Sequence, residues 1–166
     1  MKKSLLVLGM AAVLSLTGCH GLKKVKFAEF KEKVEEVSKD IKEVKSVKFS
    51  GKIEDKKFDT FTISEDNAES ELSKLDDTQV SVVLVFGLIG HVSVLTADYA
   101  IIYDAMGEEG LKDLNFYIGF GFKIKSSKDA EGGKGKMEFD KNGFMTLLQT
   151  ESNGKKSSVR FKVTLK

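Results

Sequence analysis

The hydrophobic residues of the chain follow two different periods. Between Lys26 and Lys45 they recur every three or four positions, with lysines and glutamates between them, and this spacing predicts one amphipathic helix. From Ser46 onward apolar and polar residues alternate, which is typical of half-buried strands. The strands predicted in this way are residues 46–53, 57–63, 79–86, 91–96, 99–104, 115–125, 134–140, 143–151 and 157–166.

Two of the predicted strands stand out by their apolar content. Within residues 79–86, the run from Val80 to Phe86 is apolar on both faces, with Val82 to Val85 consecutive, so we expect this strand to be covered on both sides. Residues 115–125 form the longest alternation, and Gly119 and Gly121 on its polar face suggest curvature or a close backbone neighbour. The apolar face of that strand carries Phe116, Ile118, Phe120, Phe122 and Ile124.

Short connections link most of these strands. Asn142-Gly143 and Asn153-Gly154 are hairpin signals between alternating runs. The pattern therefore predicts a mostly antiparallel β domain with one N-terminal α-helix over residues 26–166. One short helix cannot cover so many strands, so we expect the sheet to curl into an open or incomplete β-barrel with the helix packed on it. The pattern leaves open whether the interior is a packed core or an apolar cavity.

The N-terminus has the features of a targeting signal and is not expected to belong to the folded domain. Lys2 and Lys3 precede an apolar run from Leu5 to Leu14. Ten residues are too few to span a bilayer, which needs ~20, and a basic start before such a run predicts a secretory signal peptide. We assign residues 1–18 to that peptide.

The signal peptide ends in a short motif, Leu16-Thr17-Gly18-Cys19. This motif resembles the bacterial lipobox, which implies diacylglycerol on the Cys19 sulfur and cleavage before that residue. Residues 19–25 then form a lipidated tether, and the lipid anchor makes the membrane a partner. His20 stands where an aspartate would resemble an inner-membrane retention signal, so in a Gram-negative cell envelope we expect the outer membrane.

The charge balance and the cysteine and histidine counts limit the kinds of partner and site that we expect. Without residues 1–18 the lysines and arginines equal the aspartates and glutamates at 25 each, so we expect no nucleic-acid partner. One cysteine excludes an internal disulfide, and two histidines leave little material for a metal site or a Cys–His pair. His91 is predicted to be an ordinary strand histidine, and the acidic stretch 64–78 lacks the spacing of an EF-hand. We expect no enzymatic activity, cofactor or metal, and a monomer.

Three segments carry a resemblance to a known family. They are the first strand, Ser46–Ile53, the Phe86–Gly90 connection and the final hairpin from Phe144 to Leu165. Together with the N-terminal helix they resemble the outer-membrane lipoprotein carrier and acceptor family, the localisation-of-lipoproteins proteins A and B. The resemblance implies an open β-barrel with a helical lid and a cavity for acyl chains such as palmitate.

The resemblance also implies residue roles. The lipobox favours the membrane-anchored acceptor, in which an apolar residue of a protruding loop is important. That loop matches Leu88 and Ile89 here, with Gly87 in place of the usual proline. The residues expected to line the cavity are Val82, Leu84, Phe86, Phe116, Ile118, Phe120 and Phe122.

The functional expectation is therefore a lipid-anchored envelope protein that binds an acyl chain or another apolar ligand without a covalent bond, as a lipid or lipoprotein acceptor or carrier. Two alternatives stay open. The first is a structural or envelope-assembly lipoprotein with a filled core and no small-molecule ligand. The second is a surface lipoprotein that binds other proteins.

Overall fold

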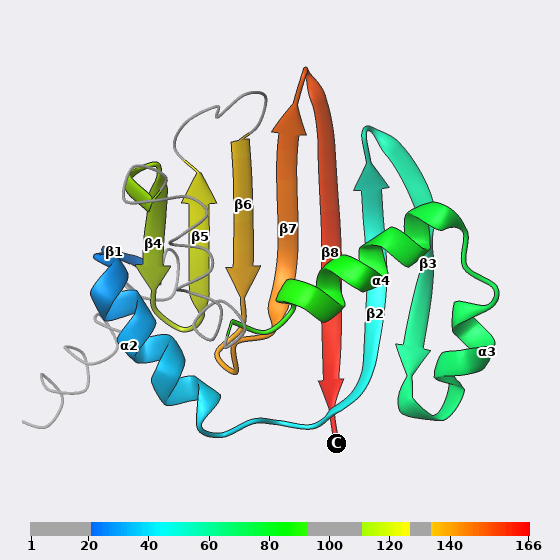
Figure 1. Cartoon of the computed structure of the whole chain (residues 1–166), viewed down its shortest axis with the longest axis horizontal. Coiled ribbons are helices and arrows are strands. Elements are labelled where there is room, and N and C mark those ends of the chain that lie inside the picture. The colour runs from blue at the N-terminus through cyan, green and yellow to red at the C-terminus, as the bar shows by residue number, and fades with distance from the viewer. Residues whose placement is uncertain (1–20, 93–110, 127–133) are drawn as a thin grey trace, which may run out of the picture.

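The computed structural model describes residues 21–92, 111–126 and 134–166, which form one antiparallel sheet of eight strands (Figure 1). The strands at the two edges do not pair with each other, so the sheet is open. In spatial order the strands are β1 (Lys23–Val25), β4 (Leu114–Ile118), β5 (Phe122–Ser126), β6 (Lys134–Phe139), β7 (Met145–Ser152), β8 (Lys155–Leu165), β2 (Val44–Ile53) and β3 (Lys56–Ser64).

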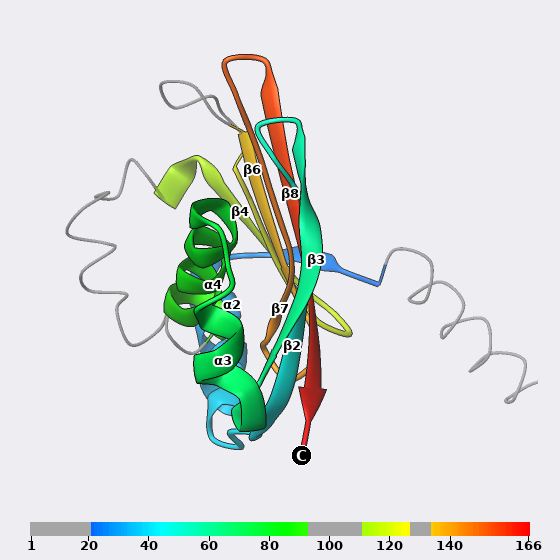
Figure 2. The ribbon, with the colours of Figure 1, turned by 90° about the vertical axis from the view of Figure 1, so that its right-hand side faces the viewer.

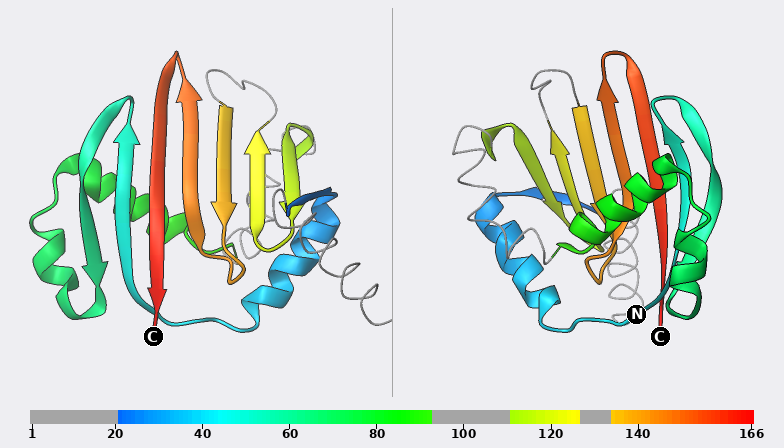
Figure 3. Two further views of the ribbon diagram at one scale, coloured as in Figure 1. Left: turned by 180° about the vertical axis from the view of Figure 1, so that it is seen from behind. Right: turned by 45° about the vertical axis from the view of Figure 1, so that its right-hand side comes forward.

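The labelled helices all lie on the same side of this sheet (Figure 2). They are α2 (Phe27–Ser38), the short helix α3 (Ala68–Leu72) and α4 (Asp77–Ile89), and the 3-10 turn η1 (Glu65–Asn67) directly precedes α3. Seen from behind, the other side of the sheet carries none of them (Figure 3). The molecule therefore has two layers, and its core lies between helices and sheet.

Phenylalanine side chains hold the helices to the sheet at two places. The ring of Phe30 on α2 lies 5.0 Å from that of Phe116 and 5.9 Å from that of Phe122. On α4 the ring of Phe86 lies 5.7 Å from that of Phe49 and 5.3 Å from that of Phe161. Buried rings in tilted or edge-on contact add stabilisation beyond the area they bury. Each of the two longer helices therefore has its own aromatic anchor.

The N-terminal helix is confirmed but is shorter than predicted. Helix α2 ends at Ser38, and Ile41, which continues the apolar spacing, is 74% exposed. Val44 already belongs to β2, where it pairs with Leu165. The apolar spacing continues past the helix because the first strand residues happen to fit it.

The predicted strand 79–86 is wrong, because these residues lie in helix α4. The helix starts with a capping box in which the Asp76 carboxylate accepts from the Gln79 backbone N–H at 2.8 Å, and the Gln79 side chain accepts from the Asp76 N–H at 3.0 Å. Gln79 also donates to the carbonyl of Asp59 on β3 at 3.0 Å. A run of valines favours a strand by propensity, but this cap and the contacts with the sheet outweigh it.

The predicted long strand 115–125 is also wrong as one element, because it is the β4–β5 hairpin. Its turn is Gly119-Phe120-Gly121, and the Gly119 N–H donates to the carbonyl of Gly121 at 3.0 Å. The expected close backbone neighbour is confirmed, since a β-carbon on Gly119 would overlap the carbonyl oxygen of Gly21. Phe120, predicted on an apolar face, is 83% exposed at this turn.

The other strand predictions differ in outcome. Those for 46–53, 57–63, 134–140, 143–151 and 157–166 are confirmed as β2, β3, β6, β7 and β8, with ends shifted by at most two residues. Of 91–96, His91 makes an isolated bridge to Phe144, and the part after Val92 lies outside the described residues, as does 99–104. The tether contributes β1, and the acidic stretch 64–78 contains η1 and α3.

The core placement predicts different costs for two phenylalanine truncations. Phe30 is 2% exposed and Phe120 is 83% exposed. We expect Phe30→Ala to lower the free energy of unfolding by ~3–5 kcal/mol, because it leaves a cavity beneath α2. Phe120→Ala should change it by no more than about 0.5 kcal/mol. Urea unfolding of both variants measures the difference, and equal costs would contradict this placement of the core.

Candidate functional site

An apolar cleft lies between α4 and the sheet. Its volume is about 290 Å³, close to the lower end of the range for ligand pockets, ~300–1,000 Å³. The side chains around it are mostly aliphatic, with one carboxylate and two hydroxyls near the first turn of the helix. The lining residues are Ile53, Asp77, Thr78, Ser81, Val82, Val85, Leu148 and Val159.

Three elements place these side chains. Val82 and Val85 are three residues apart on α4, so they lie on one side of that helix and face the sheet. Leu148 on β7 and Val159 on β8 are directly opposite each other in the antiparallel register. The Gln79 contact with β3 holds the first turn of α4 over the sheet, so the cleft depends on a buried polar group at one end of the helix.

Helix α4 is also apolar on the side that faces away from the sheet. Val80, Leu84 and Leu88 are spaced by four and are 36%, 61% and 67% exposed. Between residues 78 and 90 no side chain is charged. A surface helix ordinarily turns a polar side to water, and a helix that is apolar all round is typical of a buried environment.

Helix α2 provides the contrast within the same layer. Its water-facing side carries the ion pairs Lys31–Glu35, at 3.6 Å, and Lys33–Glu36, at 2.5 Å. Both helices lie over the same sheet, so their position alone does not explain the apolar exterior of α4. The apolar exterior is therefore a property of α4 and not of the helical layer as a whole.

The residues predicted to line a cavity are not brought together. Val82 lines the cleft, Leu84 lies on the exposed side of α4, and Phe86 packs against Phe49 and Phe161. They do not share one face because successive even positions of a helix point in different directions.

The second predicted group lies under the other helix. Phe116 and Phe122 are buried against α2, and Ile118 is partly buried beside the same core. Phe120 lies at the exposed turn of the hairpin. This group therefore fills the space beneath α2 and is separate from the cleft beneath α4.

Leu88 and Ile89 lie in the last turn of α4, so the predicted strand-to-strand loop is wrong. Leu88 is 67% exposed, whereas Ile89 packs against the hydrophobic core. The cleft residues that sequence reasoning missed are the aliphatic Ile53, Val85, Leu148 and Val159 and the polar Asp77, Thr78 and Ser81. The Asp76-x-x-Gln79 capping signal would have identified the helix and, with it, which valines face the sheet.

His91 takes part in packing. Its ring lies edge-on against Phe144 at 4.6 Å. Burial lowers the pKa of His91, and the backbone of Asn142 and the carboxylate of Asp140 only partly offset this effect. Ser93 and Asp98, its neighbours in sequence, lie outside the described residues, as does Cys19.

The described residues offer neither a metal-binding group nor a membrane-spanning helix. No three of their His, Cys, Asp or Glu side chains are grouped so that they hold a metal ion. In residues 21–92, 111–126 and 134–166 no helix has both the length and the apolar character to cross a bilayer.

Comparison with known proteins gives no relative: no family model, no curated protein and no solved structure matches this chain.

Proposed function

We propose that this protein is a lipid-anchored component of the bacterial cell envelope that holds an acyl chain or a similar apolar group in the cleft beneath α4. In this role it acts as a lipid or lipoprotein acceptor or carrier. The observation that carries the proposal is the cleft itself, with aliphatic walls from α4, β2, β7 and β8. The uncharged exterior of α4 supports it.

The size and lining of the cleft favour a linear apolar ligand. Each methylene that leaves water for such a site contributes about 0.8 kcal/mol, so even a partly enclosed chain is held by several methylenes. Of the lining residues only Asp77, Thr78 and Ser81 are polar, and all three are on the first turns of α4. The carboxylate of Asp77 repels a free fatty-acid headgroup, so the proposal favours an esterified or amide-linked acyl chain.

Attachment through Cys19 is the second part of the proposal. Residues 19–22 connect that cysteine to β1, which is hydrogen-bonded into the sheet through β4. Such a tether keeps the domain next to the bilayer. A cleft that takes an acyl chain is then held at the membrane that receives the chain. If the cell is Gram-negative, the bilayer is the outer membrane.

One observation favours the alternative of a structural lipoprotein with no ligand. The space beneath α2 is filled by the rings of Phe27, Phe30, Phe116 and Phe122. If the sides of the cleft beneath α4 close in the same way in solution, the protein has a filled core throughout. A binding measurement separates the two functions.

The anchor is tested by Cys19→Ser. Serine cannot form the thioether, so we expect an unprocessed or soluble form, whereas the wild-type protein stays in the membrane fraction after high-salt washing. Fractionation of cells that express each form, with mass spectrometry of the mature N-terminus, makes the comparison. A Cys19→Ser protein that remains wholly in the membrane fraction would show that the apolar leader is the anchor.

The cleft is tested by a matched pair of substitutions on α4. Val85→Phe places a larger ring in the cleft, and Leu84→Phe places the same ring on the exposed side of the same helix. We expect Val85→Phe to weaken binding of a fluorescent acyl ester at least ~10-fold, a change of about 1.4 kcal/mol. Leu84→Phe should leave the affinity unchanged.

Melting temperatures of both variants control for loss of fold. Equal affinities for the two folded variants would place the probe elsewhere. Absence of saturable binding to the folded wild-type protein would favour the structural alternative.

A further inference from the structure

The side of the sheet away from the helices is strongly basic. Strand register defines this outer face, because side chains alternate between the two sides and those of Phe122, Ile124, Phe49 and Val159 lie in the core beneath the helices. Among the described strands, the outer face carries eleven basic side chains, one each from β1 and β3, two each from β2, β5 and β6, and three from β8. Only two acidic side chains, Glu138 and Glu151, lie on it in these strands.

Several of these basic residues are directly opposite one another. The register pairs Lys48 with Lys162, Lys52 with Lys57, and Lys125 with Lys136. Like charges in directly opposed positions destabilise a sheet, whereas a lysine–glutamate pair in the same place would stabilise it. Three such pairs on one face therefore indicate a surface that an anionic partner neutralises.

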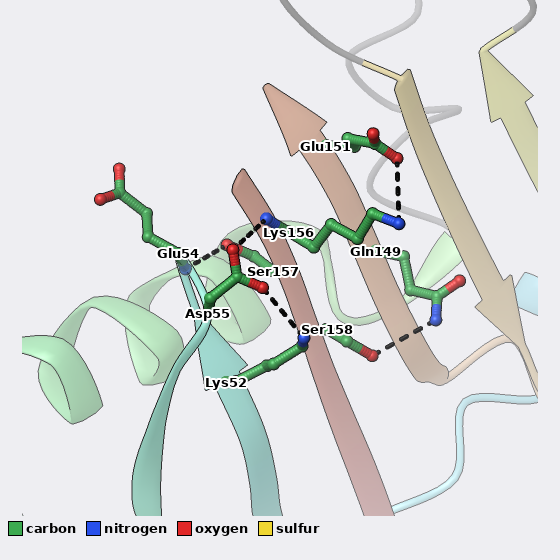
Figure 4. A network of polar contacts seen from close by, with 8 residues as sticks. All are labelled: Lys52, Glu54, Asp55, Gln149, Glu151, Lys156, Ser157 and Ser158. Atoms are coloured by element: carbon green, nitrogen blue, oxygen red, sulfur yellow. Dashed lines mark hydrogen bonds and ion pairs between the residues drawn. The ribbon is translucent and has the colours of Figure 1, made fainter. Parts of the chain in front are cut away.

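The charge is densest where the outer face is hollowed. A depression of about 560 Å³ at the ends of β5 to β8 is lined by Lys52, Lys125, Lys134, Lys136 and Lys156, with Glu151 the only acidic lining residue. Figure 4 shows part of this region, where Lys52 reaches Asp55 at 3.1 Å and Lys156 reaches Glu151 at 3.9 Å. The hydrogen bond from Lys52 and a second from the Lys156 backbone N–H lower the pKa of Asp55. Neighbouring carboxylates thus neutralise only part of this charge.

The first described residues of the chain meet the sheet on this same side. Leu22 lines a second depression, of about 350 Å³, together with Phe120 and Glu138, whose side chain is on the outer face. In Figure 2 the described chain starts on the side without helices and crosses to α2 through β1. Cys19 is three residues before Leu22 in the sequence.

An exposed aromatic residue, Phe120, lines the same depression as Leu22. Phe120 is 83% exposed, and Gly119 beside it is in contact with Gly21. Apolar side chains of this kind enter the region between headgroups and acyl chains of a bilayer. The helical layer has the opposite character, since residues 65–89 contain six acidic residues and one lysine. An anionic surface therefore attracts one side of the molecule and repels the other.

From these observations we infer that the outer face of the sheet, with Phe120 at its edge, docks on an anionic phospholipid surface. The inference rests on the proposed anchor at Cys19 for its orientation. The diacylglycerol proposed on Cys19 keeps the protein at the membrane, and a basic surface beside the anchor adds an attachment that sets the orientation of the domain. In this orientation α4 and its cleft face away from the bilayer, so the cleft is open to a ligand delivered from the surrounding solution.

Nucleic acid is a poorer match for the same charges. Single strands bind where aromatic rings stack with bases, and Tyr117, the aromatic residue whose register places it on the outer face, lies beneath the Lys123 ammonium at 4.8 Å. Arg160 is the single arginine of the chain, so bidentate recognition of phosphates or bases is limited. Lysine point charges in regular rows suit a surface of many headgroups.

Vesicle binding tests the inference with the full chain carrying Cys19→Ser, so that lipidation plays no part. Vesicles of phosphatidylcholine with phosphatidylglycerol are compared with phosphatidylcholine alone. We expect the variant Lys48→Gln, Lys125→Gln and Lys162→Gln to bind the anionic vesicles roughly 100-fold more weakly. Phe120→Ser should weaken binding roughly tenfold. The three lysine changes relieve like-charge contacts, so that variant should melt at the same temperature or higher.

The matched control removes the same charge from the helical layer, through Lys33→Gln, Lys39→Gln and Lys74→Gln. It should bind as the Cys19→Ser protein does, because these three lysines do not lie on the outer face. Residues 1–18 are common to all forms, so they do not contribute to the difference. Equal loss in both triple variants, or equal binding to neutral and anionic vesicles, would overturn the inference. Binding of dextran sulfate with the same lysine dependence, without vesicle binding, would assign the face to an acidic polymer and overturn it too. A protein that does not bind anionic vesicles can still bind an acyl ester in the cleft, so the two proposals are tested separately.

Discussion

Burial of one side of an open sheet is the constraint on which the rest of this structure depends. A sheet that does not close on itself leaves an apolar side that must be covered by other elements. Here short helices provide the cover, and they reach the sheet mainly through phenylalanine rings. Beneath α2 the rings of Phe30, Phe116 and Phe122 fill the space. Beneath α4 the aromatic contact at Phe86 lies near the end of the helix, and the valines of its earlier turns leave a cleft above β7 and β8.

The two sides of the sheet consequently carry different chemistry. The side toward the helices has aliphatic and aromatic residues, and its cover includes a helix that is apolar on its outward side as well. The other side faces water with rows of lysines, some of them in unfavourable like-charge pairs. Both features reduce stability or solubility when the protein is alone. Each is understandable if the protein works between an apolar ligand on one side and an anionic surface on the other.

The sequence predicts most of the sheet because alternation and turn residues determine it locally. Asn153 and Gly154 have φ values of 51° and 74°, as the predicted two-residue hairpin requires. The β4–β5 hairpin escaped prediction because its three-residue turn keeps the alternation in phase. Ile118 and Phe122 pair directly and lie on the same side, so only Phe120 reveals the turn, and it does so only in three dimensions.

Helix α4 was missed for a different reason. Its run of valines and leucines has no polar side, so neither the helical nor the strand period is visible. The cleft could not be predicted as a consequence, since its walls come from a helix and from strands far apart in the sequence. The outer face was missed because a net charge near zero concealed it: the basic and acidic residues lie on different sides of the molecule.

Hydrogen exchange of the backbone amides of α4, in the presence and absence of an acyl ester, tests the central claim most directly. If the cleft beneath α4 holds the ligand, exchange should slow in α4 and in the facing parts of β7 and β8, because the ligand suppresses local opening there. The β4–β5 hairpin and α2 serve as internal references and should be unchanged. Unchanged exchange in α4 at saturating ester, or equal slowing throughout the domain, would contradict a binding site beneath this helix.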